Sequence, residues 1–272
     1  MPKLGAFSEF DYSQIEPRLT AYYAQLIGFP EFAEQIRNGV DSYTAVAKLV
    51  TGKDEVTDLE RQTWKRAYLS LLYGGGVKTI QLQFGNSQAE ARKMIKTFHA
   101  NWPAVTELQE MTKRAHARKG YIVSIGGRRL HMEPYGEHKL LNKLIQGSAA
   151  DIIKDALIRI HGWLRTPAGE RTGLTYDTPV PADIALGPRL QSHMVNVIHD
   201  SAMFDGPVDE LGVLHDVIPR LMVDERVNEI VPILVDHEVS TATWADKIPY
   251  EDWRTLPDIH SREQSAAVAA QR

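Results

Sequence analysis

Four residues of one segment have the types and spacing that suit phosphate binding, and they recur at steps of four: Arg61, Lys65, Leu69 and Tyr73. In a helix such steps form a slowly turning stripe, here about 18 Å long. The two cations lie at its N-terminal end, where the helix dipole also attracts anions, and the aromatic ring lies at the other end. This polarity and length suit a nucleoside triphosphate, but an ordinary surface helix would show the same stripe.

Two aspartates have the local setting of metal ligands. Asp11 ends a short predicted strand, and Asp200 lies in a predicted hairpin bend. Carboxylates suit Mg²⁺, which also takes waters and substrate phosphates, and a pair of such ions about 3.5–4 Å apart supports in-line phosphoryl displacement. Each aspartate alone is typical of a turn. Their spacing does not show that they meet, because only the fold can join positions so far apart.

Polar side chains also follow one face of a strongly periodic helix, with Asn142 and Gln146 one turn apart. They would suit contact with a ligand, or they are simply the exposed positions of an amphipathic helix. His199, next to Asp200, is open to the same two interpretations, since a histidine beside a turn often makes only a local hydrogen bond.

Definite elements are expected to hold these side chains. Residues 6–12 predict a strand, and 195–198 with 202–204 predict a hairpin bent at 199–201. Thr57 and Glu60 form a capping-box pattern, which predicts a helix to about Tyr73 that Gly74–Gly76 ends. The remaining expectations are helices within 14–50 (broken at 28–30), 87–100, 104–119, 139–164 and 207–224, and strands at 120–125 and 231–236. Because strands and helices are segregated along the chain, the fold class expected is α+β.

Composition narrows the class of protein. The 272 residues suffice for one large domain or two modest ones, and 43% apolar content supports a sizeable core. The absence of cysteine excludes disulfides and thiolate zinc sites and fits a reducing compartment. Neither a membrane span nor a secretion signal is evident, so we expect no membrane partner and a cytoplasmic location.

The charge distribution leaves nucleic-acid binding open. A net charge of −4 counts mildly against it, because neutralising phosphates needs lysine and arginine. The stretch 113–129, however, carries six Lys or Arg residues and no Asp or Glu. This basic run is either a solvated helix face or part of a nucleic-acid surface.

Taken together, the motifs resemble those of family A DNA polymerases, the bacterial polymerase I type. The segment from Asp11 to Glu16, with Arg18, resembles their motif A, and the stripe from Arg61 to Gly74 resembles motif B. Residues 127–130 resemble the family's Gly-Arg-Arg segment, 142–154 its long palm helix, and 197–200 its motif C. All five occur in family order within about residues 6–245, which makes coincidence negligible.

The resemblance implies a polymerase palm, an antiparallel sheet with packed helices, together with helical fingers. Palm is expected at 1–24 and 131–260, and fingers at 25–130, with the motif B helix at about 58–74. The second palm segment contains an insertion at 166–191, which is longer than the family pattern, and a flexible tail is expected at 261–272.

The resemblance also implies template-directed DNA synthesis, in which a dNMP is transferred from a dNTP to a primer 3′-hydroxyl. The reaction would use two Mg²⁺ ions, for which Mn²⁺ could substitute. Asp11, Asp200 and the Tyr12 backbone carbonyl would hold the metals, and Lys65 could also protonate the leaving pyrophosphate. The implied nucleotide-binding residues are Gln14, Glu16, Arg61, Lys65, Leu69 and Tyr73, with Glu16 excluding a ribose 2′-hydroxyl. The implied primer–template contacts are Arg128, Arg129, Asn142, Gln146 and His199.

Several positions depart from the family pattern. Ser201 stands where a glutamate usually follows the motif C aspartate, which weakens water-mediated support of the metals. Leu69 replaces a common aromatic residue, which puts sugar discrimination, speed and fidelity in doubt. Three further departures are Tyr43 for a histidine, His138 for an arginine and Pro17 for a leucine.

The chain begins immediately before motif A, so the family's thumb and any exonuclease would precede Met1. We therefore expect a split polymerase of phage type, active in a bacterial host cytoplasm, with a second polypeptide that supplies the thumb and any exonuclease.

Two other functions fit parts of the pattern. A single-subunit RNA polymerase shares the motif B residues and the His-Asp-Ser of motif C, but Glu16 and the run Tyr12–Ile15 argue against it. A degenerate, non-catalytic DNA-binding subunit would not need the retained set of charged site residues.

Overall fold

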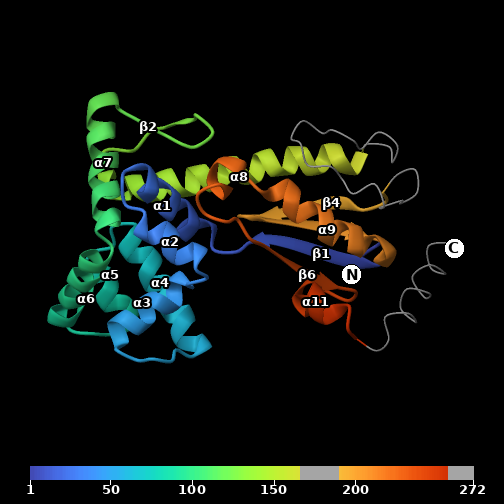
Figure 1. Cartoon of the computed structure of the whole chain (residues 1–272), viewed down its shortest axis with the longest axis horizontal. Coiled ribbons are helices and arrows are strands. Elements are labelled where there is room, and N and C mark those ends of the chain that lie inside the picture. The colour runs from blue at the N-terminus through green and yellow to red at the C-terminus, as the bar shows by residue number, and fades with distance from the viewer. Residues whose placement is uncertain (166–189, 257–272) are drawn as a thin grey trace. The chain divides into compact units, whose positions relative to one another are not determined.

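The computed structural model describes residues 1–165 and 190–256 (Figure 1). The chain forms two compact units. Unit 1 comprises Met1–Ile15, Ile152–Asp224 and Ile233–Arg272, and unit 2 comprises Glu16–Asp151 and Glu225–Pro232. The predicted insertion, apart from its last two residues, and the predicted tail lie outside the described residues.

Unit 1 is built on an antiparallel sheet with the strand order β4-β5-β1-β6-β7. The predicted strand at 6–12 and the predicted hairpin are confirmed. The bounds are β1 Ala6–Tyr12, β4 His193–Ile198, β5 Ser201–Gly206, β6 Val235–Ser240 and β7 Ile248–Pro249. Because β1 is central, its side chains meet those of β5 on one side and β6 on the other.

Alternation along β1 gives the sheet two different faces. Phe10 is buried and stacks on His237 of β6, with the ring centroids 4.1 Å apart. Helix α9 (Leu211–Met222) covers this face, since its His215 stacks in turn on His237. Glu9 and Asp11 therefore point to the opposite face, which is covered by the short helix η4 (Trp244–Asp246) and Lys247.

The other elements of unit 1 follow the predictions less closely. The helix expected at 207–224 is present as η3 (Val208–Glu210) and α9, and α11 (Tyr250–Trp253) was not predicted. The strand expected at 231–236 was placed wrongly, because β6 begins only at Val235. Backbone groups of the earlier residues have other partners: Val231 donates to Val227, and the Pro232 carbonyl accepts from Arg18.

Unit 2 is mainly helical. The predicted helices are confirmed except that the segment after residue 30 is divided a second time, between α2 and α3, and α5 was missed. The bounds are α1 Ile15–Leu26, α2 Glu31–Arg37, α3 Ser42–Thr51, α4 Asp58–Leu72, α5 Val77–Phe84, α6 Gln88–Asn101, α7 Pro103–Lys119 and α10 Glu225–Asn228. Helix α8 (Leu140–Arg165) gives its first part to unit 2. The capping box of Thr57 and Glu60 opens α4 as predicted, and Gln109 of α7 donates to the carbonyls of Leu71 and Leu72 at its end.

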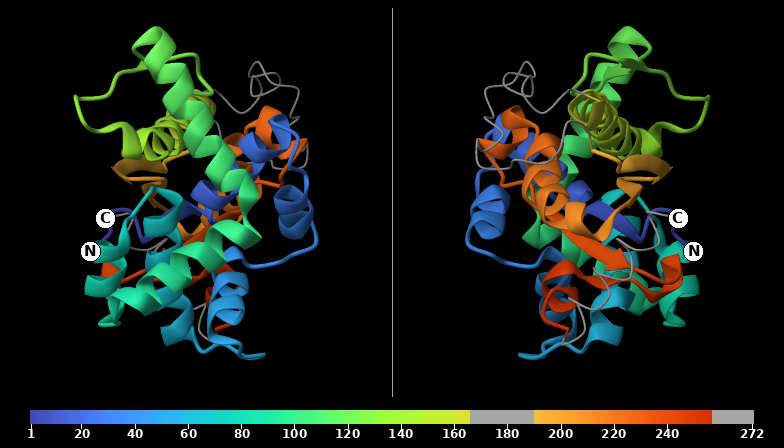
Figure 2. Two further views of the ribbon diagram at one scale, coloured as in Figure 1. Left: turned by 90° about the vertical axis from the view of Figure 1, so that its left-hand side faces the viewer. Right: turned by 90° about the vertical axis from the view of Figure 1, so that its right-hand side faces the viewer.

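A two-stranded hairpin completes unit 2. The strand expected at 120–125 is reduced to β2 (Ile122–Val123), which pairs with β3 (Arg129–Leu130). Gly120, in the left-handed conformation, ends α7, so that this helix leads directly into the hairpin (Figure 2). Among residues 1–165 and 190–256, no helix is both long and apolar enough to cross a membrane.

Candidate functional site

One candidate site is a group of carboxylates on one face of the unit 1 sheet. Asp11 lies directly between Ser201 of β5 and Asp236 of β6 in the strand register. Partial burial of the carboxyl group, followed by the charges of Asp200, Glu9 and Asp236, raises the pKa of Asp11 to about 6. The fold therefore brings Asp11 and Asp200 together, which sequence spacing could not show.

The turn between β4 and β5 presents Asp200. Ile198 pairs with Ser201, so the connection has only two residues, His199 and Asp200. His199 adopts a positive φ of 56°, a conformation that residues with a side chain seldom occupy. The Ser201 hydroxyl donates to the Ile198 carbonyl at 3.1 Å and helps to close the turn.

Beside Asp11 lies an ion-pair group that the sequence did not reveal. Glu9 is almost buried, and its Oε2 accepts from Lys247 Nζ at 2.6 Å and from Trp244 Nε1 at 2.5 Å. Lys247 also reaches Glu238 at 2.7 Å. Burial alone would raise the pKa of Glu9, but the hydrogen bonds from Lys247 and Trp244 outweigh it and hold that pKa below its ordinary value.

The carboxylate group fits Mg²⁺ better than a metal that needs a complete protein cage. Within the described ranges, no cluster of three or more His, Cys, Asp or Glu side chains could surround a metal. Mg²⁺ is commonly held by one or two carboxylates and completed by waters and substrate phosphates. Asp11 and Asp200 offer such a partial set of hard oxygen ligands.

A separate candidate site is a pocket of about 610 Å³ in unit 2. It brings together five of the residues predicted for nucleotide or DNA binding: Glu16, Leu69, Tyr73, Asn142 and Gln146. Gln146 Nε2 lies 3.3 Å from Glu16 Oε1, which links α8 to α1. Burial, with the charge of Glu16, raises the pKa of the Tyr73 phenol well above its ordinary value.

Glycines after α4 give the pocket its shape. A Cβ on Gly74 would lie 2.7 Å from the His138 carbonyl oxygen, and one on Gly75 would lie 2.3 Å from the Ser70 hydroxyl. Gly74 also has a positive φ of 78°. The chain can therefore pass this close to His138 only without a side chain.

Sequence reasoning assigned no binding role to other residues that line the pocket, among them Arg66, Ser70, Thr79, Gln83 and Lys139, and it noted His138 only as a departure from the family pattern. A signal for two of them was present. Ser70 and Arg66 stand three and seven residues before Tyr73, the spacing of one helix face. Thr79 and Gln83 belong to α5, which was not predicted.

Arg61 and Lys65 lie together but do not line this pocket. Steps of four drift by about 40° each, so Arg61 lies about 120° around α4 from Tyr73. Both cations lie over the Tyr43 ring, 5.4 and 5.5 Å from its centroid. Arg61 also makes a two-pronged ion pair with Asp41, at 3.0 and 2.7 Å, whereas the exposed Lys65 meets no carboxylate in the described part of the chain.

The remaining predicted residues lie at turns. Gln14, between β1 and α1, has a positive φ of 55°. Arg128 and Arg129 belong to the β2–β3 hairpin, where Arg128 binds Asp151 and the Gly147 carbonyl, and the Arg129 guanidinium lies 4.9 Å from the Tyr121 ring centroid.

Comparison with known proteins identifies the class to which this fold and site belong. The model of DNA polymerase family A matches residues 2–246, so the chain belongs to DNA polymerase family A. The α+β fold, with its antiparallel sheet and packed helices, is confirmed by similarity to a solved polymerase domain. That structure is the POL domain of Pol1 from M. smegmatis in complex with DNA primer–template and dNTP, with a TM-score of 0.71, 25% identity and coverage of 87% of this chain and 39% of that one.

Curated relatives give the same result. DNA polymerase I of Bacillus caldotenax is 27% identical over 248 residues, which cover 87% of this chain and 25% of the relative. DNA polymerase I of Pseudomonas aeruginosa is 30% identical over 167 residues, or 57% of this chain and 18% of the relative. The chain thus spans about a quarter of the length of the curated relatives it matches.

Proposed function

We propose that this chain is the catalytic portion of a DNA-directed DNA polymerase, which transfers a dNMP from a dNTP to a primer 3′-hydroxyl by a two-metal mechanism. One observation carries the proposal: in a chain of DNA polymerase family A, Asp11 of β1 pairs with Ser201, the residue that follows Asp200 in the β4–β5 turn, so the two aspartates lie at the same end of neighbouring strands. Two neighbouring carboxylates suit a pair of Mg²⁺ ions, which also take waters and substrate phosphates as ligands.

The carboxylate group binds the metals in this proposal. Asp11, Asp200 and the Tyr12 carbonyl hold two Mg²⁺ ions, for which Mn²⁺ can substitute. When bound, the ions stabilise the charge on the attacking and leaving oxygens. Lys247 forms ion pairs with Glu9 and Glu238 beside these ligands.

The helical unit binds the nucleotide. Lys65, exposed and without a carboxylate partner among the described residues, binds the triphosphate and protonates the leaving pyrophosphate, and Arg61 assists while Asp41 orients it. In the pocket, Tyr73 offers a stacking surface, and Glu16 leaves no room for a ribose 2′-hydroxyl. Gln14 and Leu69 complete the nucleotide contacts.

Primer–template binding is assigned to polar and basic side chains of both units. Asn142 and Gln146 present amides from α8 within the pocket, and His199 lies beside Asp200. The β2–β3 hairpin, which carries Arg128 and Arg129, adds positive charge, and a phosphate contact there would hold the duplex in position.

The basic test is primer extension with carboxylate variants. Asp11→Asn and Asp200→Asn are each expected to lower Mg²⁺-dependent dNTP incorporation by at least about 100-fold, because removing one charged group of such a site raises the barrier by several kcal/mol. Asp252→Asn, which alters an exposed carboxylate of α11, is the control and should leave incorporation unchanged.

Two results would count against the proposal. Incorporation by Asp11→Asn at the wild-type rate would exclude the metal role, and preference for rNTPs over dNTPs would favour an RNA polymerase. That a separate, phage-encoded polypeptide supplies a thumb and any exonuclease stays a prediction. Its test is copurification with the tagged chain, and extension that no copurifying protein stimulates would contradict it.

A further inference from the structure

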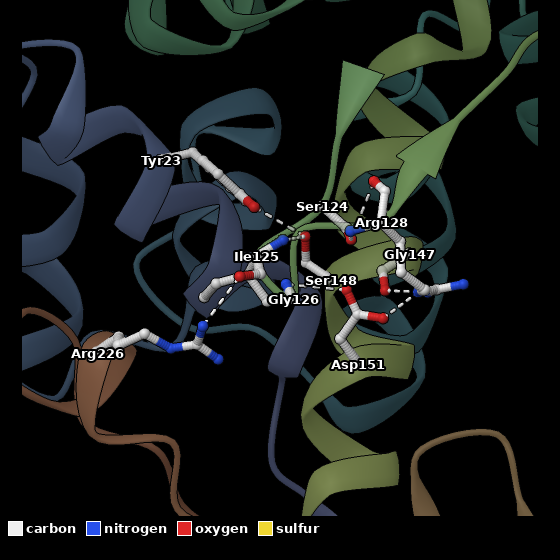
Figure 3. A network of polar contacts seen from close by, with 9 residues as sticks. All are labelled: Tyr23, Ser124, Ile125, Gly126, Arg128, Gly147, Ser148, Asp151 and Arg226. Atoms are coloured by element: carbon white, nitrogen blue, oxygen red, sulfur yellow. Dashed lines mark hydrogen bonds and ion pairs between the residues drawn. The ribbon is translucent and has the colours of Figure 1, made fainter. Parts of the chain in front are cut away.

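The turn between β2 and β3 is held by side chains from one stretch of α8. Figure 3 shows the contacts. Ser148 Oγ accepts from the Ile125 N–H at 3.1 Å, and Asp151 Oδ2 accepts from the Gly126 N–H at 3.0 Å. These backbone donors, which would otherwise need water, are satisfied by two buried side chains, with exposed fractions of 0% and 6%.

Close packing fixes the same contact. A Cβ on Gly126 would lie 2.7 Å from the Asp151 carboxylate, and a Cβ on Gly147 would lie 2.6 Å from a methyl group of Leu130. A methyl group at either position would therefore force the Asp151 or the Leu130 side chain to move. The segment Gly147–Asp151 therefore acts as a surface on which the hairpin rests.

Two other elements restrain the turn. The Tyr23 hydroxyl of α1 lies 2.8 Å from Ser148 Oγ, and Arg226 of α10 donates to the Ile125 carbonyl at 2.9 Å (Figure 3). All of these residues belong to unit 2. The turn is thus fixed from three helices that are far apart in the sequence.

Arg128 and Arg129 are neighbours in the sequence, but only the Arg128 side chain takes part in the hydrogen-bond network. Arg128 is used by the protein: its Nε binds Asp151, its Nη2 donates to the Gly147 carbonyl at 2.8 Å, and its N–H donates to Ser124 Oγ at 3.2 Å. Arg129 is exposed, lies over the Tyr121 ring, and meets no carboxylate within residues 1–165 and 190–256. Its guanidinium keeps all its donors for another partner.

We infer that Arg129 makes the contact between this turn and a primer–template phosphate, and that Asp151 and Arg128 are a positioning pair that aims Arg129. The inference rests on the proposed function. An exposed arginine stacked on an aromatic ring is pre-oriented for a phosphate, and Arg118 and Lys119, exposed at the end of α7, add positive charge just before the hairpin.

The test measures the affinity of the full-length chain for a fluorescent primer–template by anisotropy at several salt concentrations, with thermal unfolding recorded for each variant. Arg129→Met should weaken binding about tenfold and make the slope of log K against log salt shallower by about one, the loss of one phosphate contact. Arg92→Met, which alters an exposed arginine of α6, should change neither quantity.

Arg128 variants separate positioning from direct contact. Arg128→Met should weaken binding about threefold, and the double variant with Arg129→Met should bind no more weakly than Arg129→Met alone. Arg128→Lys keeps the charge but loses the planar fork that grips Asp151 and Gly147. It should therefore behave like Arg128→Met, whereas a direct phosphate contact would survive the change. Asp151→Asn should also weaken binding.

Three outcomes would overturn the inference: additive effects at positions 128 and 129, wild-type affinity in Arg128→Lys, or tighter binding by Asp151→Asn, which would mean that Asp151 competes with DNA for Arg128. Each would leave the proposed function intact if the wild-type chain binds primer–template. A wild-type chain that binds none would overturn the inference and the proposed function together.

Discussion

Lys247 is the cation that pairs with the carboxylates beside Asp11. Its ammonium group joins Glu9 and Glu238, and Glu9 has no more than 8% of its side chain exposed. Lys247→Met would leave this carboxylate buried without its cation. We expect a loss of about 3 kcal/mol in the free energy of unfolding, as is usual when one partner of a buried pair is removed, measured by urea denaturation.

A matched pair on the surface gives the control. Lys53 and Glu60 also form an ion pair, but the Lys53 side chain is 57% exposed. Lys53→Met should change the free energy of unfolding by less than about 1 kcal/mol, because solvent screens exposed pairs. Equal losses in the two variants would show that burial of Glu9 does not control the effect.

His237 gives the fold a specific sensitivity to acid. Burial, with the nearby His215, lowers the pKa of His237 to about 3. In the unfolded chain the value is about 6.5. Between pH 6.5 and pH 3, the imidazole is protonated in the unfolded chain but not in the folded protein. The free energy of unfolding therefore falls as the pH decreases through this range, by up to about 1.4 kcal/mol per pH unit.

In His237→Gln the unfolded chain can no longer take up a proton at this position. Compared at pH 7 and pH 4 by denaturant unfolding, the variant should lose less stability on acidification than the wild type. Its stability at pH 7 is expected to be lower, because the ring stacks on Phe10 and contacts Ser8. An identical acid dependence in both proteins would contradict the assignment of this effect to His237.

Among the elements, the motif B helix was predictable because its signals are local. Thr57 and Glu60 specify its start and the glycine run its end, whatever the rest of the chain does. The position of strand β6 could not be predicted in the same way, because it depends on hydrogen bonds with the distant strand β1. Val231–Ile233 is apolar and looks like a strand, but its backbone is bound elsewhere, whereas the true strand contains Asp236, His237 and Glu238, which sequence patterns disfavour.

The end of α4 gives a prediction for an element. Gly74→Ala should destabilise the protein by about 1–3 kcal/mol and narrow the pocket, because the new methyl group meets the His138 carbonyl. Gly85, which ends α5, has a similar positive φ of 66° but no atom within 4 Å of an added Cβ. Gly85→Ala should therefore lose stability only through the strained backbone conformation, without a steric clash. The difference in thermal stability between the two variants then measures the effect of the clash with His138.

If the two alanine variants are equally stable, the close approach to His138 has no energetic importance. A difference that appears only in dNTP affinity, with equal stability, would place the effect in the pocket instead.

For the whole molecule, neither unit is continuous in the sequence, and this limits what the sequence can reveal. The meeting of Asp11 with Asp200 depends on strand pairing across most of the chain. Unit 2 likewise takes in residues 225–232, whose carbonyls at Pro232 and Ile230 accept from Arg18 and Arg37. The family resemblance supplied the order of the motifs, but only the fold shows these contacts.

A truncation tests this interleaving. A chain that ends at Asp224 loses the partners of Arg18 and Arg37, and the Ile125 carbonyl loses Arg226. We expect faster amide hydrogen exchange in α1, α2 and the hairpin turn, measured by mass spectrometry. Exchange in these segments at the full-length rate would show that residues 225–232 do not stabilise unit 2.

The contact between Trp244 and Glu9 has an optical consequence. The sequence has five tryptophans; Trp64, Trp102, Trp163 and Trp253 are at most 8% exposed, whereas Trp244 is 46% exposed. An aqueous quencher will therefore act mainly on Trp244, and its indole N–H is bonded to the carboxylate two residues before Asp11. If cations bind at the carboxylate face as proposed, we expect the emission of Trp244 to change, and a Mg²⁺ titration without any added label measures this.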